Sequence, residues 1–301
     1  MKYRKSITLL VLCIAVLSLL AAGIGVLSSG VLGQQHTFLS IRGETVSIFG
    51  KGIYANDSVS SVAQAIAQDL VTIFMGVPLL IISTFFARKG YLRARLLLAG
   101  TLAYFLYTYM SYSFLCMYNS LFLVYVALMS LSFFAFVLVM MSFDMKMIEQ
   151  AFQDNFPVKT IGIFMIVFVS LIGLMWLGRI VPPLMSGTAP TGLQHYTTLV
   201  IQVMDLGFVI PVSILSAILL MKRKPFGLLL ASVMCMKGVT MSTALTAMVI
   251  VQITAGVPMT AAEIIVFPVA NVLIIIGVLA FIKRIQEPKQ MTVEKRHHNK
   301  N

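Results

Sequence analysis

Eight long stretches of the chain are almost entirely apolar, and they limit the fold more than any other feature. They cover 6–32, 70–87, 96–116, 121–143, 160–178, 198–221, 226–251 and 261–282. About 20 mainly apolar residues suffice for a helix to cross a hydrocarbon core roughly 30 Å thick. Because backbone groups in lipid must be hydrogen-bonded within the chain, helices are the expected structure. The sequence therefore predicts an all-α, polytopic transmembrane helix bundle with eight spans.

The position of the basic residues predicts how the bundle is oriented. The net charge of +12, with 22 Lys and Arg against 10 Asp and Glu, would by itself also suit a nucleic-acid-binding protein. However, 18 of the 22 basic residues fall in segments on one side of the predicted spans. Basic residues accumulate on the cytoplasmic side, so we expect both termini in the cytoplasm and a location in the cell (inner) membrane. The partner of this basic surface would then be the anionic lipid headgroups of the bilayer, and no nucleic acid is expected.

The first span has one alternative interpretation, a secretory signal peptide, because residues 1–30 combine a basic start with an apolar run. The run at 6–32 is longer than the usual signal core of about 7–15 residues, and no clean A-x-A site follows. A stripe of small residues at four-residue spacing, which suits close helix packing in a membrane, is formed by Ala21, Gly25, Ser29 and Gly33. We therefore favour an uncleaved span.

The remaining segments are short. We expect one transmembrane domain, 1–285, with outer loops at 33–69 and 179–197, and a basic cytoplasmic tail at 286–301 that is predicted to be disordered. Shorter elements are predicted within these segments: a strand at 45–49, a helix at 58–69 capped by Asp57 or Ser58, and an interfacial helix within 144–159.

A weak internal sequence similarity suggests a duplication. Asp69 is followed by Pro78 in the second span, and Asp205 is followed by Pro211 in the sixth. Both spans are predicted to run from the outside to the inside, so the similarity fits a parallel 4+4 repeat of a kind found in some membrane carriers.

Asp205 and Lys237 are the ionisable residues that lie well inside a predicted span. A central Asp or Lys costs about 2.5–3.5 kcal/mol on insertion scales, and such residues face the protein interior or a wet cavity. Two interpretations are open at this stage. The pair is either a buried ion pair that only orients helices, or a polar site for a substrate or a proton.

A second set of polar residues gathers towards the predicted outer face. Asp69 and Glu263 open spans, and prolines 78, 211 and 268 follow in the spans near Asp69, Asp205 and Glu263. A proline frees a backbone carbonyl and kinks a helix, which can shape a cavity. The candidates for an outward-facing vestibule are Asp69, Glu263, Tyr104, Tyr107, Tyr109 and Tyr112, with His36, Asp57 and His195 in the outer loops. An ordinary interfacial belt of tyrosines and acids is the alternative interpretation.

No motif supports a cofactor, a metal site or a known type of catalysis. Cys13, Cys116 and Cys235 lie in separate apolar stretches, which excludes a disulfide scaffold and Cys-based zinc sites. Phosphate loops, nucleotide fingerprints and the HExxH and GxSxG motifs are absent from the sequence. We therefore expect no metal and no cofactor, and a protein that is not an enzyme is favoured.

Several segments resemble an uncharacterised family of prokaryotic multi-pass membrane proteins with about eight spans. The segments are GKGIYANDSV, AQDLVTIFMGVPLL, RKGYLRARLLLAGTLAYFLYTYMSYSF, YNSLFLVYVAL and DLGFVIPVSILSAILLMKRKPFGLLLASVMCMKG. The resemblance covers most of the chain and implies an integral membrane protein of a bacterium or archaeon. It implies no activity and no catalytic residue, but Asp69, Asp205 and Lys237 lie within the matching segments.

Three functional hypotheses follow. The first is binding or transport of a small molecule or ion through an outward-facing site centred on Asp205 and Lys237. The second is a membrane enzyme acting on a lipid headgroup, which would require His36, Asp57 or His195 to converge beside a lipid-accessible groove. The third is a sensor or assembly partner that uses the loop at 33–69, which an exposed apolar patch there would support.

Overall fold

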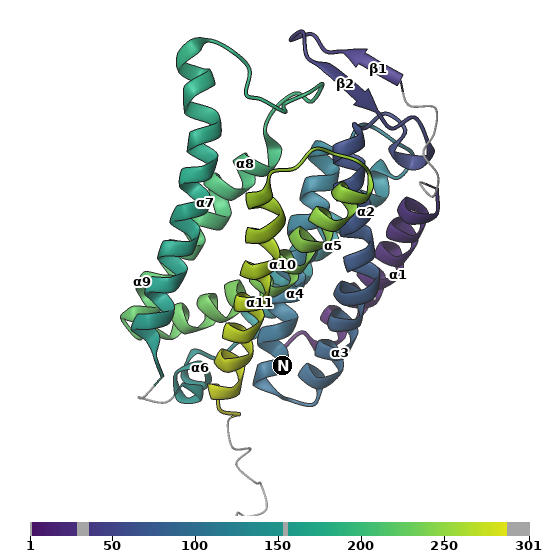
Figure 1. Ribbon diagram of the computed structural model, residues 1–301. Coiled ribbons are helices and arrows are strands. Elements are labelled where there is room, and N and C mark those ends of the chain that lie inside the picture. Colours follow the sequence, from purple (N-terminus) through teal and green to yellow (C-terminus); the bar gives the residue numbers. More distant parts are fainter. Residues whose placement is uncertain (1, 29–35, 153–155, 288–301) are drawn as a thin grey trace, which may run out of the picture.

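A computed structural model describes residues 2–28, 36–152 and 156–287. These residues form a bundle of helices with a two-stranded hairpin at one end (Figure 1). The helices are α1 (Arg4–Ser28), η1 (Gly52–Tyr54), α2 (Val59–Val71), η2 (Thr72–Gly76), α3 (Val77–Arg88), α4 (Leu92–Leu115), α5 (Phe122–Met141), α6 (Met145–Ala151), α7 (Val158–Ser186), α8 (Val200–Met204), η3 (Asp205–Val209), α9 (Ile210–Met221), α10 (Pro225–Thr254) and α11 (Ala261–Arg284), and the strands are β1 (His36–Leu39) and β2 (Thr45–Ile48). The predicted all-α class is confirmed.

Seven helical segments in the described part of the chain are long and apolar enough to cross a membrane. Two of them continue through a π-helical turn, Val59–Arg88 and Val200–Met221. These segments establish an integral, multi-pass membrane protein. The remaining predicted span, 96–116, corresponds to α4, which is 24 residues long but is not among the seven. Its four tyrosines and its hydroxyl residues make it less apolar than the other long helices.

The interior of the bundle is formed by α4 and α10. The largest buried side chains include Tyr104, Tyr109 and Phe105 of α4, and α10 packs against α2, α4, α9 and α11. Gly100 explains how α4 and α10 approach each other, since a Cβ built at this position would lie 2.3 Å from the Met236 Cβ. The absence of a side chain at Gly100 therefore allows close backbone packing of the two central helices.

The outer surface is apolar, whereas many interior side chains are polar. Leu171 and Leu174 of α7 and Ile265 of α11 are more than half exposed, while Gln68 and Lys237 are buried. Soluble proteins rarely expose large contiguous apolar patches. This distribution agrees with a chain whose exterior contacts lipid and whose interior holds the polar groups.

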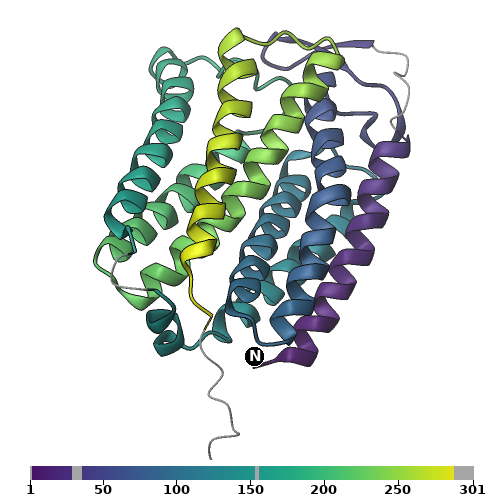
Figure 2. The ribbon, with the colours of Figure 1, turned by 60° about the horizontal axis from the view of Figure 1, so that its bottom comes forward.

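The segments predicted to be cytoplasmic gather at one end of the bundle. The start of α1, the α3–α4 turn, α6 and the last turn of α11 lie at the end opposite the β-hairpin (Figures 1 and 2). Hydrogen bonds connect three of these segments: the Arg93 side chain donates to the Ile285 carbonyl, and the Gln286 amide donates to the Ala151 carbonyl at 2.8 Å. These contacts place the C-terminal end of α11 beside α6 and the start of α4.

Local predictions for the loops agree with the structure. β2 falls within the strand predicted at 45–49, and α2 begins after Ser58, whose hydroxyl accepts a hydrogen bond from the Ser61 amide. The helix predicted within 144–159 corresponds to α6, and its interfacial location stays a prediction. The predicted disordered tail lies outside the described residues, apart from Gln286 and Glu287.

Candidate functional site

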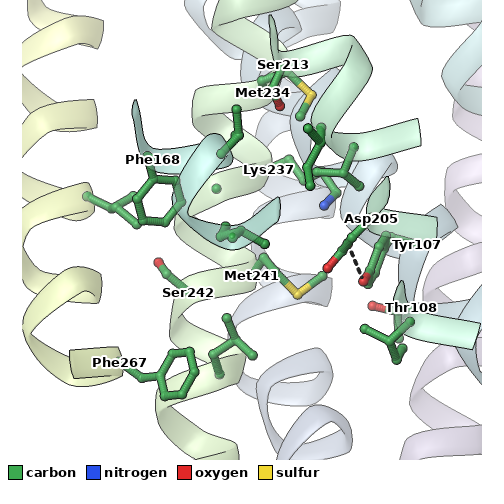
Figure 3. A pocket seen from close by; sticks show the side chains of 18 of the residues that line it. Tyr107, Thr108, Phe168, Asp205, Ser213, Met234, Lys237, Met241, Ser242 and Phe267 are labelled. Atoms are coloured by element: carbon green, nitrogen blue, oxygen red, sulfur yellow. Dashed lines mark hydrogen bonds between the residues drawn. The ribbon is translucent and has the colours of Figure 1, made fainter. Parts of the chain in front are cut away.

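Asp205 joins three helices through its carboxylate. The Tyr107 hydroxyl of α4 donates a hydrogen bond to Oδ1 at 2.9 Å, and the Trp176 indole N–H of α7 donates one to Oδ2 at 3.0 Å. Figure 3 shows the bond between Asp205 and Tyr107. Hydrogen bonds to a carboxylate are stronger than neutral ones, so this arrangement holds Asp205 in one orientation.

Lys237 of α10 lies beside this carboxylate and is 8% exposed. Its Nζ is 4.2 Å from the centroid of the Tyr107 ring, within the range of a cation–π interaction. Figure 3 shows the amino nitrogen directed towards Asp205 and Tyr107. Within the described residues, however, no direct ion pair joins Lys237 to Asp205, and no hydrogen-bond acceptor lies on Nζ. The two predicted residues therefore meet through Tyr107.

The backbone explains why these three side chains converge. Asp205 is the first residue of η3, a π-helical turn followed by Pro211 near the start of α9. π-Helical turns are rare and occur often at functional sites. On α4, Tyr107 lies two helical turns beyond Gly100, which packs against Met236 and the Lys237 backbone of α10, and the long Lys237 side chain reaches the Tyr107 ring.

A cavity of about 710 Å³ contains this group of residues. Its volume falls within the range of roughly 300–1,000 Å³ typical of ligand pockets. The walls come from α2, α4, α7, α9, α10 and α11, and most lining residues are apolar, including Phe164, Phe168, Met241 and Phe267. Asp205, Lys237 and Tyr107 all line it, and Asp57 and Tyr112 do so as well.

Asp69, the other acid of the predicted vestibule, lies outside the cavity lining in a sealed cluster. It is 2% exposed, and its carboxylate accepts hydrogen bonds from the Tyr54 hydroxyl at 2.7 Å and the Tyr112 hydroxyl at 3.0 Å. A Cβ built on Gly25 of α1 would lie 2.0 Å from Asp69 Oδ2. Asp69 thus connects α1, the η1 loop, α2 and α4 through contacts that are sealed from the cavity.

Two further vestibule candidates, Tyr104 and Tyr109, are also buried away from the cavity lining. The Tyr104 hydroxyl accepts a hydrogen bond from the Gln68 amide at 2.6 Å and lies 3.2 Å from the Thr72 hydroxyl oxygen. This network links α2 and η2 to α4. Of the four predicted tyrosines, Tyr107 and Tyr112 reach the cavity.

Glu263 does not join the other acids. It is exposed at the start of α11, where its carboxylate accepts hydrogen bonds from the Thr260 backbone and hydroxyl, both at 2.8 Å, and completes a capping box. A capping box satisfies backbone donors at a helix N-terminus. The structure therefore gives Glu263 a capping role.

The outer-loop candidates are arranged around Tyr196, which lies near Asp57 and His195. The Tyr196 hydroxyl donates to Asp57 Oδ1 at 2.9 Å, and burial raises the pKa of the Asp57 carboxyl to about 6, partly opposed by hydrogen bonds from the Met117 amide and Tyr196. Asp57 Oδ2 is buried and has no hydrogen-bond partner among the residues that the structure describes.

The two histidines do not complete a catalytic group with Asp57. A His195 ring nitrogen lies 3.1 Å from the Asn56 carbonyl oxygen, and His36 is exposed at the start of β1. Among the described residues no hydrogen bond joins His36, Asp57 and His195 to one another. The convergence that a membrane enzyme would require at these residues is not observed.

Two residues that contact the predicted acids, Trp176 and Tyr196, were not identified as candidates from the sequence. Trp176 is the single tryptophan of the chain and occurs in an otherwise apolar span. A buried indole N–H usually finds a partner, and this offered a signal that Trp176 would meet a polar group. Tyr196, in an irregular loop, offered no such signal, because only the fold brings it to Asp57.

The chemistry available at the cavity is charge recognition within an apolar enclosure. Lys237 provides an ammonium group with three donors, and Asp205 provides a carboxylate whose oxygens are already engaged. Within residues 2–28, 36–152 and 156–287, no group of three or more His, Cys, Asp or Glu side chains is placed to hold a metal ion.

No family model matches the chain, and no curated protein or solved structure is similar to it. The resemblance to a prokaryotic membrane family therefore stays a prediction. What the chain shows directly is its class: an integral membrane protein with a polar group enclosed in a large, mainly apolar cavity.

Proposed function

We propose that this membrane protein binds or transports a small molecule or ion at the cavity that contains Asp205 and Lys237. One observation carries the proposal: a buried lysine that has no direct ion pair among the described residues lies in the wall of a cavity of about 710 Å³. A packing role alone would be served by sealed contacts of the kind Asp69 makes. Charged groups in spans that face a cavity are typical of substrate and ion pathways.

The proposed topology has eight spans, with α4 as the span enclosed by the others. Both termini would lie in the cytoplasm of a prokaryotic cell, with the β-hairpin end facing outwards. This orientation is supported by the gathering of the basic segments at the end where α1 begins (Figures 1 and 2). The similar π-turn and proline arrangements at η2 and η3 are consistent with the proposed 4+4 repeat.

The experiment compares Lys237→Met and Asp205→Asn with the unchanged protein. Purified protein is screened by thermal shift against amino acids, organic anions, organic cations and metal ions, and any hit is tested for uptake into proteoliposomes. Both substitutions should abolish the ligand-induced shift, because they remove the charges in the cavity wall. Lys222→Met, at an exposed position between α9 and α10, is the control and should keep it. If both cavity variants retain the stability and ligand response of the unchanged protein, the proposal is wrong.

The β-hairpin supports a second candidate, a sensor or assembly partner. Phe38, Leu39 and Ile41 are 45%, 67% and 93% exposed on the same outer loop, which fits an apolar contact surface. Replacing all three by serine should release a bound membrane protein in a pull-down if this candidate is right. The candidate is contradicted if the variant retains the same bound protein, or if neither the unchanged protein nor the variant retains one.

A further inference from the structure

The helices of the first half of the bundle, α1 to α5, and those of the second half, α7 to α11, differ in whether they pack into a closed group. In the first half, α1 packs against α5, so the helices α1 to α5 form a closed group. In the second half, α7 packs against α9 and η3, and α11 packs against α10, but no comparable packing joins α7 to α11 within the described residues. Both views show α7, in teal, standing apart from α11, in yellow (Figures 1 and 2).

The cavity lies where the second half is not closed. Its lining includes Phe164 and Phe168 of α7 and Phe267 and Phe281 of α11. These two helices are also the least buried of the candidate spans, with 17% of the most apolar window of each buried inside the structure. The cavity is therefore bordered by two helices that face the surrounding hydrocarbon, and a molecule dissolved in the bilayer can reach it sideways.

The polarity of the lining changes along the cavity. Towards the β-hairpin end, α2 and α4 contribute hydrogen-bonding groups, among them Gln64, Gln68 and Thr108. Beyond Lys237 in the other direction, Phe164, Met165, Met234, Ile274, Val278 and Phe281 predominate. A largely apolar cavity with hydrogen-bonding groups towards one end matches a ligand with a polar head and an apolar tail better than it matches an ion, because a water-sized ligand occupies only about 30 Å³.

Lys237 lies at the boundary of these two regions. Its positive charge favours a ligand whose polar head carries a negative charge. Its ammonium group contacts the face of Tyr107, but within the described residues it has no hydrogen-bond acceptor. The nearby Asp205 carboxylate is already bound on both oxygens, by Tyr107 and Trp176. A buried ammonium gains most from an acceptor that carries negative charge.

From these features we infer that the cavity binds an anionic amphiphile, a carboxylate or phosphate attached to an alkyl chain. The head group accepts hydrogen bonds from Lys237, and the chain lies among the apolar side chains between α7 and α11. The inference rests on the proposed function and specifies its ligand class. The ligand reaches the site from the bilayer rather than from water.

Trp176 makes this inference directly measurable, because it is the single tryptophan and its indole contacts Asp205 beside the cavity. Bromine quenches indole fluorescence at short range. Purified protein in detergent is titrated with dodecanoate that carries bromine on a carbon near its head group, where the inferred pose lies close to Trp176, and with dodecyl phosphate and the uncharged alcohol brominated at the same position. Saturable quenching by either anion, and only weak non-saturating quenching by the alcohol, is expected. The anion that binds more tightly shows whether the site prefers a fatty-acid carboxylate or a lipid phosphate.

Two variants separate the head-group contact from the tail contact. Lys237→Met should weaken anion binding about tenfold to a hundredfold, the range for a charge-assisted hydrogen bond. Gly277→Phe should block the tail region, since a Cβ at this cavity-lining position meets nothing within 4 Å and the added ring enters the cavity. Gly178→Phe is the matched control: its Cβ also meets nothing within 4 Å, but Gly178 is not in the lining, so binding should be unchanged.

The outcomes distinguish this inference from the proposed function. Equal saturable quenching by the anions and the alcohol, or anion binding unaffected by Lys237→Met, would overturn the anionic amphiphile. Butyrate and inorganic phosphate are tested in parallel by thermal shift. If these short anions produce a shift that depends on Lys237 while the long-chain anions do not bind, the site is functional but its ligand is water-soluble. If no compound gives a Lys237-dependent response here or in the ligand screen, both proposals fail.

Discussion

Gly25 provides a sharp test of how α1 packs against α2. This glycine faces the Asp69 cluster, and a Cβ built on it would lie 2.0 Å from Asp69 Oδ2 and 2.8 Å from the Tyr54 hydroxyl oxygen. Gly25→Ala therefore cannot be accommodated without moving the carboxylate or separating the helices. Gly23, two residues earlier in the same helix, meets nothing within 4 Å when a Cβ is added. Gly23→Ala is accordingly the matched control.

The expected loss follows from two contributions. Overpacking a filled site costs about 1–3 kcal/mol. Moving the carboxylate by more than an ångström breaks at least one of its hydrogen bonds to Tyr54 and Tyr112, which adds about 1 kcal/mol. We therefore expect Gly25→Ala to lower the free energy of unfolding by about 2–4 kcal/mol relative to Gly23→Ala, since the gain from replacing a helical glycine is common to both.

The assay is reversible unfolding in mixed micelles of mild detergent and dodecyl sulfate, followed by circular dichroism. A double-mutant cycle with Asp69→Ala locates the effect, because removing the carboxylate takes away the closest contact of the added methyl group and releases the Tyr54 hydroxyl, the next closest, from its hydrogen bond. In that background, Gly25→Ala should cost less than about 1 kcal/mol. If Gly25→Ala and Gly23→Ala are equally stable, or if the cost of Gly25→Ala persists without the Asp69 carboxylate, the packing described here for α1 is wrong.

Two further predictions concern the central helices and the outer loop. Gly100→Ala should destabilise the protein by about 1–3 kcal/mol, because its Cβ would lie 2.3 Å from the Met236 Cβ, whereas Gly238→Ala, with its closest contact at 3.9 Å, should be nearly neutral in the same unfolding assay. Asp57 predicts a pH dependence: burial raises its pKa to about 6, above the unfolded value of about 3.9, so the folded state holds this proton more tightly. The free energy of unfolding should fall by up to about 3 kcal/mol as the pH rises from about 4 to 6, then level off, and Asp57→Asn should remove this slope. A slope that survives in Asp57→Asn, or equal stability of the two glycine variants, would contradict the respective prediction.

The sequence predicted most of the helices because hydrocarbon thickness and the scarcity of charge are encoded locally. The stretch 226–251 lies within α10, and Ser58 caps α2 as one of the two residues predicted for that role. The helix α4 illustrates a limit of this reasoning. Its tyrosines lower its hydropathy, which a helix enclosed by other helices tolerates because protein groups bond the hydroxyls.

The site was predictable only in part, since local patterns do not reveal which helices meet. Charge inside a span pointed to Asp205 and Lys237, and both lie in the cavity wall. The same reasoning grouped Asp69 and Glu263 with them, although one is sealed by Tyr54 and the other caps α11. Deciding between these environments requires the helix rotations and neighbours that only the three-dimensional packing provides.

The π-helical turn at η3 holds one residue more than the corresponding α-helical turn. The five residues of this turn cover about the same rotation and rise as four α-helical residues, so the helical segments on either side keep nearly the register of an uninterrupted α-helix. Deleting one residue within 206–209 would therefore restore α-helical geometry and leave the direction of Asp205 relative to α9 nearly unchanged. Such a deletion separates the carboxylate from the turn that precedes α9. Ligand recognition that survives the deletion depends on the Asp205 side chain, and recognition that is lost depends on the wider turn itself.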